Sequence, residues 1–182
     1  MRALIVYESM FGSTRQVAEA IAEGLREGAD VRVVGVADAP TTLDDFDLVV
    51  VGGPTQAWSM SRPSTRRGAP LHVNKPGSGL ALEPGADIGP GVREWLASIG
   101  HAQTKAAAAF DTRVKAPVLL TGRASKRIAR ELSRHGLSVV AFPRSFLVDK
   151  GSHLVLGELE RARTWGESLA TVVGRLQTGT SA

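Results

Sequence analysis

The stretch that decides the fold is residues 3–25, which read "ALIVYESMFGSTRQVAEAIAEGL". Its first five residues are apolar, as in a buried strand, whereas Val17, Ile21 and Leu25 recur every four residues, as on the buried side of a helix. Between the two lies "YESMFGST", which combines hydroxyl side chains with a glycine. The stretch therefore predicts a strand, a turn rich in hydrogen-bonding groups, and a helix.

The rest of the chain continues this alternation. We expect further strands at residues 30–36, 47–53, 105–111 and 138–148, and helices at residues 92–100, 122–136 and 158–176. Strands that are joined by helices pair in parallel through right-handed crossovers. The order of elements thus predicts an α/β fold, a three-layer αβα sandwich around a five-stranded parallel sheet.

Length and composition favour a single domain over residues 1–182. The chain has 182 residues, 43% of them hydrophobic, which is enough for one full core. It contains no cysteine, so disulfides and thiolate chemistry are excluded and redox chemistry would need a cofactor. No apolar run reaches the roughly 18 residues of a membrane span, and we expect a soluble, cytoplasmic protein without a metal site.

The formal net charge of +4 is unevenly distributed. Residues 1–104 hold 9 basic and 12 acidic side chains, whereas residues 105–182 hold 13 basic and 6 acidic ones. Part of this excess lies along one side of the predicted helix at 122–136, opposite a stripe of Ala124, Ile128 and Leu132. The pattern favours a solvated helix face over an anion-binding surface, and the lack of interleaved aromatic residues argues against nucleic acid.

The turn after the first strand suits a phosphate group. In an open parallel sheet, ligands bind beyond the carboxyl ends of the strands, and a helix amino terminus there offers unpaired N–H groups. Ser9, Ser13 and Thr14 add hydroxyl groups, and Gly12 lets the backbone come close. The alternative is that Ser13 or Thr14 simply caps the helix. Neither the nucleoside-triphosphate loop nor the dinucleotide fingerprint is present.

These residues resemble the signature of the flavodoxins and flavodoxin-like proteins. The match is an apolar strand, an aromatic residue, then hydroxyl residues and a glycine before Thr and a helix, and a second match is the loop "VVVGGPTQAWSMSRP" at residues 49–63. The resemblance implies FMN as cofactor, a sheet order of 2-1-3-4-5, a phosphate held by residues 9–14, and Trp58 beside the flavin ring. It assigns three segments to the cofactor: Ser9, Met10, Phe11, Gly12, Ser13 and Thr14; Pro54, Thr55, Gln56, Ala57, Trp58 and Ser59; and Phe110, Asp111, Thr112 and Arg113.

Two departures from the family bear on function. The third segment lacks the tyrosine that stacks on the flavin in flavodoxins, so one ring face is either open or covered in another way by residues 110–113. Flavodoxins that carry electrons are also typically acidic, whereas this chain is basic, with Arg62, Arg66, Arg67, Arg113 and Lys115 near the predicted site. Because positive charge favours the anionic reduced flavin, we expect a less reducing cofactor.

A third departure from the family is an insertion at about residues 63–91, with 5 prolines and 6 glycines in 29 residues. This composition is unfavourable to helix and strand alike and predicts a mobile lid, a wall on the substrate side, or plain disorder.

Two hypotheses about function follow. The first is an FMN-dependent redox protein that exchanges electrons with a partner protein or reduces a small acceptor such as a quinone, with the flavin carrying the chemistry and no catalytic side chain. The second is a flavodoxin-like domain that no longer binds flavin and acts as an interaction module.

Overall fold

The computed structural model describes residues 1–56, 58–73, 80–102 and 105–179. Its centre is a parallel sheet that contains β1 (Arg2–Tyr7), β2 (Asp30–Gly35), β3 (Leu48–Gln56) and β5 (Ala106–Val114). Two short strands, β6 (Ser138–Val139) and β7 (Arg144–Val148), both pair with β5, and the order of the sheet is β2-β1-β3-β5-β6. The predicted order 2-1-3-4-5 is confirmed, with β5 as the fourth predicted strand and β6 with β7 as the fifth.

The fifth predicted strand is broken by a two-residue bulge. Ala107 pairs with Val139, but Phe110 pairs with Arg144, which lies two residues further along than a continuous register would require. Pro143 lies inside the break and has no N–H to donate to a ladder. A further short strand, β4 (Ser59–Met60), folds back antiparallel onto β3 and was not predicted.

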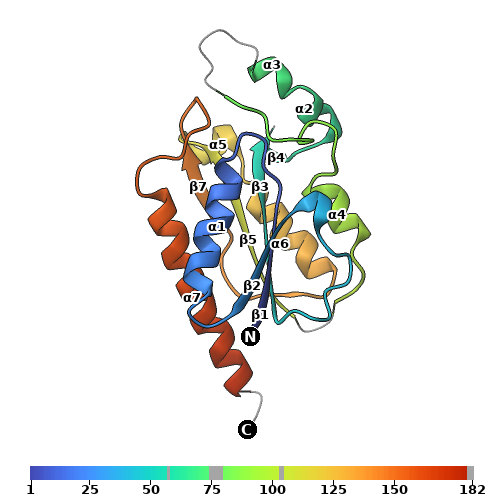
Figure 1. Ribbon diagram of the computed structural model, residues 1–182, viewed down its shortest axis with the longest axis vertical. Coiled ribbons are helices and arrows are strands. Elements are labelled where there is room, and N and C mark those ends of the chain that lie inside the picture. The colour runs from blue at the N-terminus through green and yellow to red at the C-terminus, as the bar shows by residue number, and fades with distance from the viewer. Residues whose placement is uncertain (57, 74–79, 103–104, 180–182) are drawn as a thin grey trace.

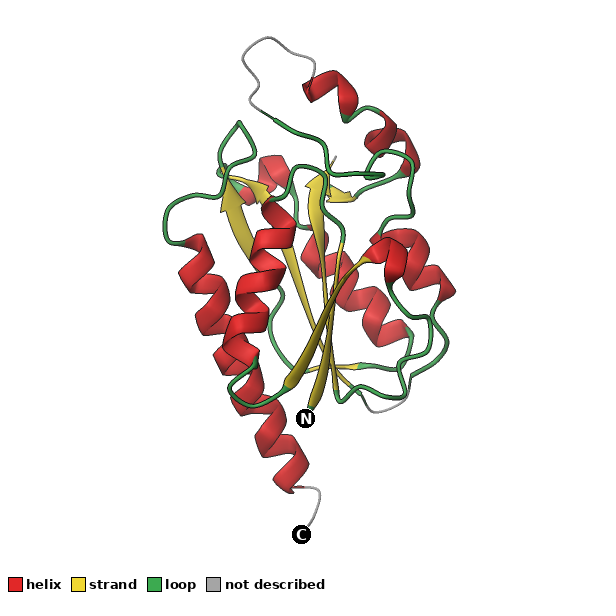
Figure 2. Ribbon diagram, viewed as in Figure 1, coloured by secondary structure: helices red, strands yellow, loops and turns green. Residues whose placement is uncertain are grey.

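Helices cover both faces of the sheet (Figure 1 and Figure 2). α1 (Ser13–Leu25) and α7 (Glu158–Gly179) lie side by side on one face, and α4 (Val92–Ser98) and α6 (Ala124–Arg134) lie on the other. Each face has its own apolar cluster, because the central strands β1, β3 and β5 alternate their side chains between the two. None of the helices in the described ranges is long and apolar enough to span a membrane.

The 63–91 insertion contains helices that its composition did not predict. α2 (Pro63–Arg67) and α3 (Pro70–Val73) follow one another at its beginning. Pro63 and Pro70 each occupy the first turn of a helix, where a missing N–H costs nothing, so the prolines here start helices instead of preventing them. Two one-turn helices complete the fold, η1 (Val36–Asp38) and α5 (Val118–Thr121).

Two glycines allow α1 and α7 to touch backbone to backbone. A Cβ on Gly166 would overlap the carbonyl oxygen of Ile21, and a Cβ on Gly24 would overlap the carbonyl oxygen of Arg163. Gly174, on the same helix as Gly166, has no heavy atom within 4 Å of such a Cβ. The close crossing therefore depends on Gly24 and Gly166 and not on Gly174.

We expect Gly166→Ala and Gly174→Ala to change stability in opposite directions. Gly166→Ala forces the helices apart and should lower the free energy of unfolding by about 1–3 kcal/mol. The added methyl group of Gly174→Ala contacts no other atom, and this variant should raise the free energy of unfolding by about 0.5–1 kcal/mol, because alanine loses less backbone entropy in a helix. Urea denaturation of both variants checks the pair, and equal effects would contradict the close crossing.

Candidate functional site

The turn between β1 and α1 leaves a helix amino terminus without a side-chain cap. Gly12 is the residue before the first turn, with φ of 90° and ψ of −24°, a left-handed conformation that favours glycine. Its N–H donates to the Ser9 hydroxyl at 3.1 Å, which fixes the turn. Ser13 and Thr14 lie inside the helix, so neither caps it, and the alternative that they are simple caps is wrong. The first-turn N–H groups are left available to another acceptor.

The hydroxyl groups of Ser13 and Thr14 instead tie α1 to two distant segments. The Ser13 hydroxyl donates to the carbonyl oxygen of Ser152, and the Thr14 and Thr112 hydroxyls are hydrogen-bonded at 2.7 Å. Ser152 has a φ of 60° in the turn between β7 and α7. These bonds bring the end of β5 and the β7–α7 turn to the amino terminus of α1.

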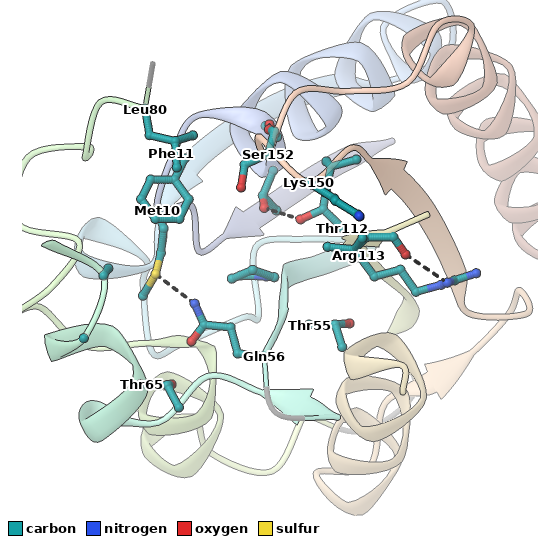
Figure 3. Close-up of a pocket in the computed structure, with 17 residues that line it drawn as sticks. Met10, Phe11, Thr55, Gln56, Thr65, Leu80, Thr112, Arg113, Lys150 and Ser152 are labelled. Carbon is teal, nitrogen blue, oxygen red and sulfur yellow. Dashed lines mark hydrogen bonds between the residues drawn. The ribbon is translucent and has the colours of Figure 1, made fainter. Parts of the chain in front are cut away.

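A cavity of about 560 Å³ opens where these segments meet (Figure 3). Nine of the sixteen residues predicted from the sequence line it: Met10, Phe11, Ser13, Thr14, Pro54, Thr55, Gln56, Thr112 and Arg113. Residues that the sequence did not single out complete the lining: Thr65, Gly68, Ala69, Leu80, Val114, Val148, Lys150 and Ser152. The structure therefore brings the three predicted segments together around one space.

The insertion forms one wall of this cavity. Its helix α2 and the turn after it supply Thr65, Gly68 and Ala69, and the loop before α4 supplies Leu80. Further on, the N–H of Glu83 donates to the Met10 carbonyl at 2.8 Å, and its carboxylate accepts from Arg15 at 2.7 Å. The described part of the insertion is thus joined to the β1–α1 turn, which corresponds to the predicted wall.

Phe110 and Asp111 do not line the cavity, in contrast to the prediction. Both are fully buried on β5, where alternate residues point to opposite faces of the sheet. The Phe110 ring lies against Gly52 and makes edge contacts with Phe146 and Trp165 in the core under α1 and α7. Asp111 points to the other face and accepts a hydrogen bond from the Ser125 N–H at 2.7 Å.

Trp58 does not line the cavity either. Its side chain is 66% exposed, and a φ of 65° turns the backbone so that Trp58 pairs with Gly122. Ser59 continues into β4 and is also outside the lining, while Ser9 and Gly12 contribute only to the shape of the first turn. Ala57 lies outside the described residues.

A buried polar network, not predicted from the sequence, anchors the second loop of the site. Glu8 is 5% exposed; its carboxylate accepts hydrogen bonds from the Ser61 hydroxyl and from the Val92 N–H at 2.9 Å. The Arg66 guanidinium donates to Ser61 at 3.1 Å and pairs with Glu94 at 2.9 Å. Glu8 follows Tyr7 directly and would have been visible as a charged residue at the end of a buried strand.

Burial raises the pKa of both buried carboxyls, Glu8 and Asp111, above the ordinary values. The hydrogen bonds from Ser61 and Val92 to Glu8, and from Ser125 to Asp111, act in the opposite direction but do not cancel the effect. In the folded chain these groups hold their protons to higher pH than in the unfolded chain.

The raised pKa of Asp111 predicts a definite pH dependence of stability. Because the folded state binds the proton more tightly, stability is lost as pH rises from about 3.9, the unfolded value, through the raised folded pKa. Asp111→Asn removes this loss but keeps an acceptor for Ser125. The free energy of unfolding of Asp111→Asn minus that of the wild type, measured by urea titration, should therefore increase as the pH rises from 4 to 7. A difference that is constant over this range would contradict the raised pKa.

Two cations face the cavity. Arg113 is held by its own loop, since one guanidinium nitrogen donates to the Ala116 carbonyl at 2.8 Å and to the Thr121 hydroxyl at 3.2 Å. Lys150 comes from the β7–α7 turn and lies near Thr112 on the same side of the cavity as Arg113 (Figure 3). No ion pair involves either side chain among the described residues, so the site carries net positive charge.

Comparison with known proteins agrees with the order of strands and helices described above. The sequence model of the flavodoxin family matches residues 5–59, which contain the end of β1, the turn, α1, β2 and β3. Across almost the whole chain, the fold matches that of a flavodoxin from the domain Archaea, at a TM-score of 0.64 and 23% identity, covering 96% of this chain and 99% of the other. The chain has a flavodoxin-like fold. The resemblance inferred from the two loop motifs is confirmed.

Other matches to the flavodoxin-like chain extend the same result. Flavodoxin 1 of Bacillus cereus superposes at a TM-score of 0.62 with 20% identity, covering 94% of this chain and 98% of that protein. A flavodiiron core from Synechocystis matches at 0.60 with 15% identity; the match covers 97% of this chain but only 36% of the larger one. An uncharacterised protein of Methanocaldococcus jannaschii is 42% identical over 60 residues, which are 30% of this chain and 15% of that relative.

Proposed function

We propose that this chain binds FMN in the 560 Å³ cavity and acts as a redox protein that transfers electrons or reduces a small acceptor such as a quinone. The single observation that carries the proposal is the uncapped amino terminus of α1 at the edge of this cavity. Unpaired helix N–H groups bind anions well, and flavodoxins generally bind FMN, whose phosphate is such an anion. The cavity also has the size of a cofactor site.

Unpaired polar atoms at the other side of the cavity support the same ligand. The Gln56 side-chain oxygen is buried and has no hydrogen-bond partner among the described residues, and the same holds for the Arg113 Nε. Buried polar atoms are nearly always paired, so these two are candidates for contact with a ligand. A flavin ring has both N–H and carbonyl groups, and it can therefore satisfy an acceptor and a donor together.

The roles of the residues follow from these positions. FMN, when bound, supplies one- or two-electron redox chemistry that no side chain here can supply. The first turn of α1 would hold the phosphate, Gln56 would orient the ring, and Met10 and Phe11 would exclude water. Lys150 and Arg113 would favour negative charge in the cavity. Because Trp58 does not line the cavity, its side chain would not restrict the access of a small acceptor to the cofactor.

The test is a titration of the purified chain with FMN, followed by visible absorbance and by equilibrium dialysis. Saturable uptake of one FMN per chain, with a shift of the flavin bands, is the expected result. If FMN does not bind in excess, the proposal fails and the interaction-module hypothesis takes its place. The cytoplasmic location expected from the sequence stays a prediction.

We expect Lys150→Met to make the bound cofactor more reducing. Removing a positive charge that interacts with the anionic reduced flavin by about 1.4 kcal/mol would lower the midpoint potential of a two-electron couple by about 30 mV. Lys105→Met, at the opposite end of β5, is the matched control and should leave the potential unchanged. Spectroelectrochemical titration measures both potentials, and an unchanged potential in Lys150→Met would contradict this prediction. A wild-type potential as low as that of an acidic flavodoxin would contradict the less reducing cofactor expected from the basic sequence.

A further inference from the structure

An exposed apolar cluster lies beside the cavity and has no role in the proposed cofactor site. We call it the α5 patch; its members are Trp58, Val118, Leu119 and Leu120, which are 66%, 38%, 91% and 67% exposed. Nothing in α5 is buried, so this helix contributes no side chain to the core. Single exposed apolar residues are common, but a contiguous group of them marks an interaction site.

The geometry of the backbone holds this patch together. Trp58 forms a bridge with Gly122, the residue that ends α5, and a Cβ on Gly122 would overlap the Trp58 backbone. Gly122 also has a φ of 73°, which favours glycine, so the close approach and the turn both require this residue. Trp58 and α5, 60 residues apart in the sequence, are thereby fixed side by side.

The patch is attached to the cavity wall. Arg113 lines the cavity and donates to the Ala116 carbonyl and to the Thr121 hydroxyl, on either side of the exposed leucines. On β3, Thr55 also lines the cavity, and its hydroxyl accepts a hydrogen bond from the Ala124 N–H at 2.9 Å. A molecule seated on the α5 patch would therefore lie at the rim of the proposed cofactor site.

The two segments that carry the patch contain basic but no acidic side chains. Residues 112–130, which contain α5, hold six basic side chains and no acidic one, and residues 54–67, which contain Trp58, hold three basic and no acidic ones. Arg66 is neutralised by Glu94, and Arg127 lies 3.9 Å from Glu131. Among the described residues no ion pair involves Arg62, Lys115 or Lys126, all exposed.

Arg62 of one segment and Arg127 of the other both act on Arg93 of α4, whose guanidinium donates to the carbonyl oxygens of Met60 and Ser61. Burial and these two positive charges lower the pKa of Arg93, although Glu94 and Glu131 act in the opposite direction. A surface that already repels its own cations gains most from a partner that brings negative charge.

We propose that the α5 patch is the docking surface for an acidic protein, whose apolar centre covers Trp58 and the leucines while its carboxylates meet the surrounding cations. Apolar centres ringed by complementary charge are typical of protein interfaces. A second copy of this chain would bring like charge to like charge. A nucleic acid would satisfy the cations, but its phosphates would leave three aliphatic side chains without contact. That the partner exchanges electrons rests on the proposed FMN function, whereas the docking itself does not.

The experiment measures binding with the flavin-free chain. A small acidic plant-type ferredoxin is the probe, and basic cytochrome c is the charge control; the ¹⁵N-labelled chain is titrated at low salt and followed by NMR. Trp58 has the exposed indole, whereas Trp95 and Trp165 are 4% and 6% exposed, so the Trp58 indole N–H reports directly on the patch. With ferredoxin we expect saturable chemical-shift changes at Trp58 and at residues 118–122, and with cytochrome c we expect none. The changes seen with ferredoxin should disappear at about 0.5 M salt, because salt screens the charges.

Matched variants locate the contact. Leu119→Glu and Lys126→Glu should each weaken binding by about tenfold or more, because each adds a negative charge to the surface that faces the acidic probe. Leu156→Glu, at a fully exposed leucine on the β7–α7 turn, and Arg175→Glu, on α7, should leave it unchanged. All four positions are exposed, and circular dichroism confirms that each variant is folded before it is titrated.

Three outcomes would overturn the proposal: no saturable binding of the acidic probe, equal weakening by Leu119→Glu and Leu156→Glu, or tighter binding of a single-stranded oligonucleotide than of the ferredoxin. Because no flavin is present, none of these can arise from failure of FMN to bind. FMN uptake is measured separately by absorbance, so the two proposals fail independently.

Discussion

Gly12→Asp is expected to weaken FMN binding by at least about a hundredfold, since two like charges about 4 Å apart near a protein surface repel by several kcal/mol. The substitution places a carboxylate at the uncapped first turn of α1, where the proposed phosphate site lies. Aspartate tolerates the left-handed conformation of residue 12 better than most residues. The nearest atom to a Cβ there is a Glu83 carboxylate oxygen at 3.6 Å, which is paired with Arg15. Equilibrium dialysis of FMN against each variant gives the two dissociation constants.

Gly12→Asn is the matched control for this result. It has the same shape and the same backbone strain but no charge, so its loss of affinity should be much smaller than that of Gly12→Asp. Equal losses in both variants would mean that backbone strain, and not anion binding at the helix amino terminus, explains the effect. Unchanged affinity in Gly12→Asp would remove the phosphate from this turn altogether.

Phe110→Ala is expected to lower the free energy of unfolding by about 3–5 kcal/mol, the cost of emptying a large site in a packed core. Phe110 is fully buried, its ring fills the space above Gly52, and Phe146 and Trp165 contact its edges at centroid distances of 6.2 and 6.5 Å. These neighbours are held by β7 and α7 and have little freedom to fill the gap. Urea denaturation at pH 7 measures the change.

The same variant separates a core role from a cofactor role. Because Phe110 does not line the cavity, the folded fraction of Phe110→Ala should bind FMN with nearly wild-type affinity at low temperature. Phe110→Leu, which keeps most of the apolar volume, should lose clearly less stability. A small change in stability together with a large loss of FMN affinity would restore the role that the sequence predicted for Phe110.

The predictions that succeeded rest on patterns with a direct physical cause. The apolar run at residues 47–53 predicts a strand buried on both faces, and Leu48–Val51 are fully buried in β3. The stripe of Ala124, Ile128 and Leu132 is buried on α6, as its spacing requires. The fifth strand, by contrast, was predicted as one run at residues 138–148, but it is divided into β6 and β7, and Pro143 in the break cannot donate to the ladder.

Predictions about single side chains in the site were less successful. The three cofactor segments came together, but the direction of each side chain depended on its neighbours. Phe110 points to the core because strand alternation puts it opposite Gly52, and Trp58 points to solvent because its backbone is bound to Gly122. Neither partner is near its residue in the sequence, so no local pattern could reveal the contact.

The order of strands and helices, the position of the turn at residues 9–14 and the charge of the carboxyl-terminal part can all be read from the chain alone, because they depend on local periodicity and on composition. The lining of the cavity cannot be read in this way. Ser152, Lys150 and Leu80 reach it from segments far along the chain. The hydrogen bonds of Ser13 with Ser152 and of Thr14 with Thr112 exist only after the sheet has assembled and brought the ends of β1, β5 and β7 to one edge.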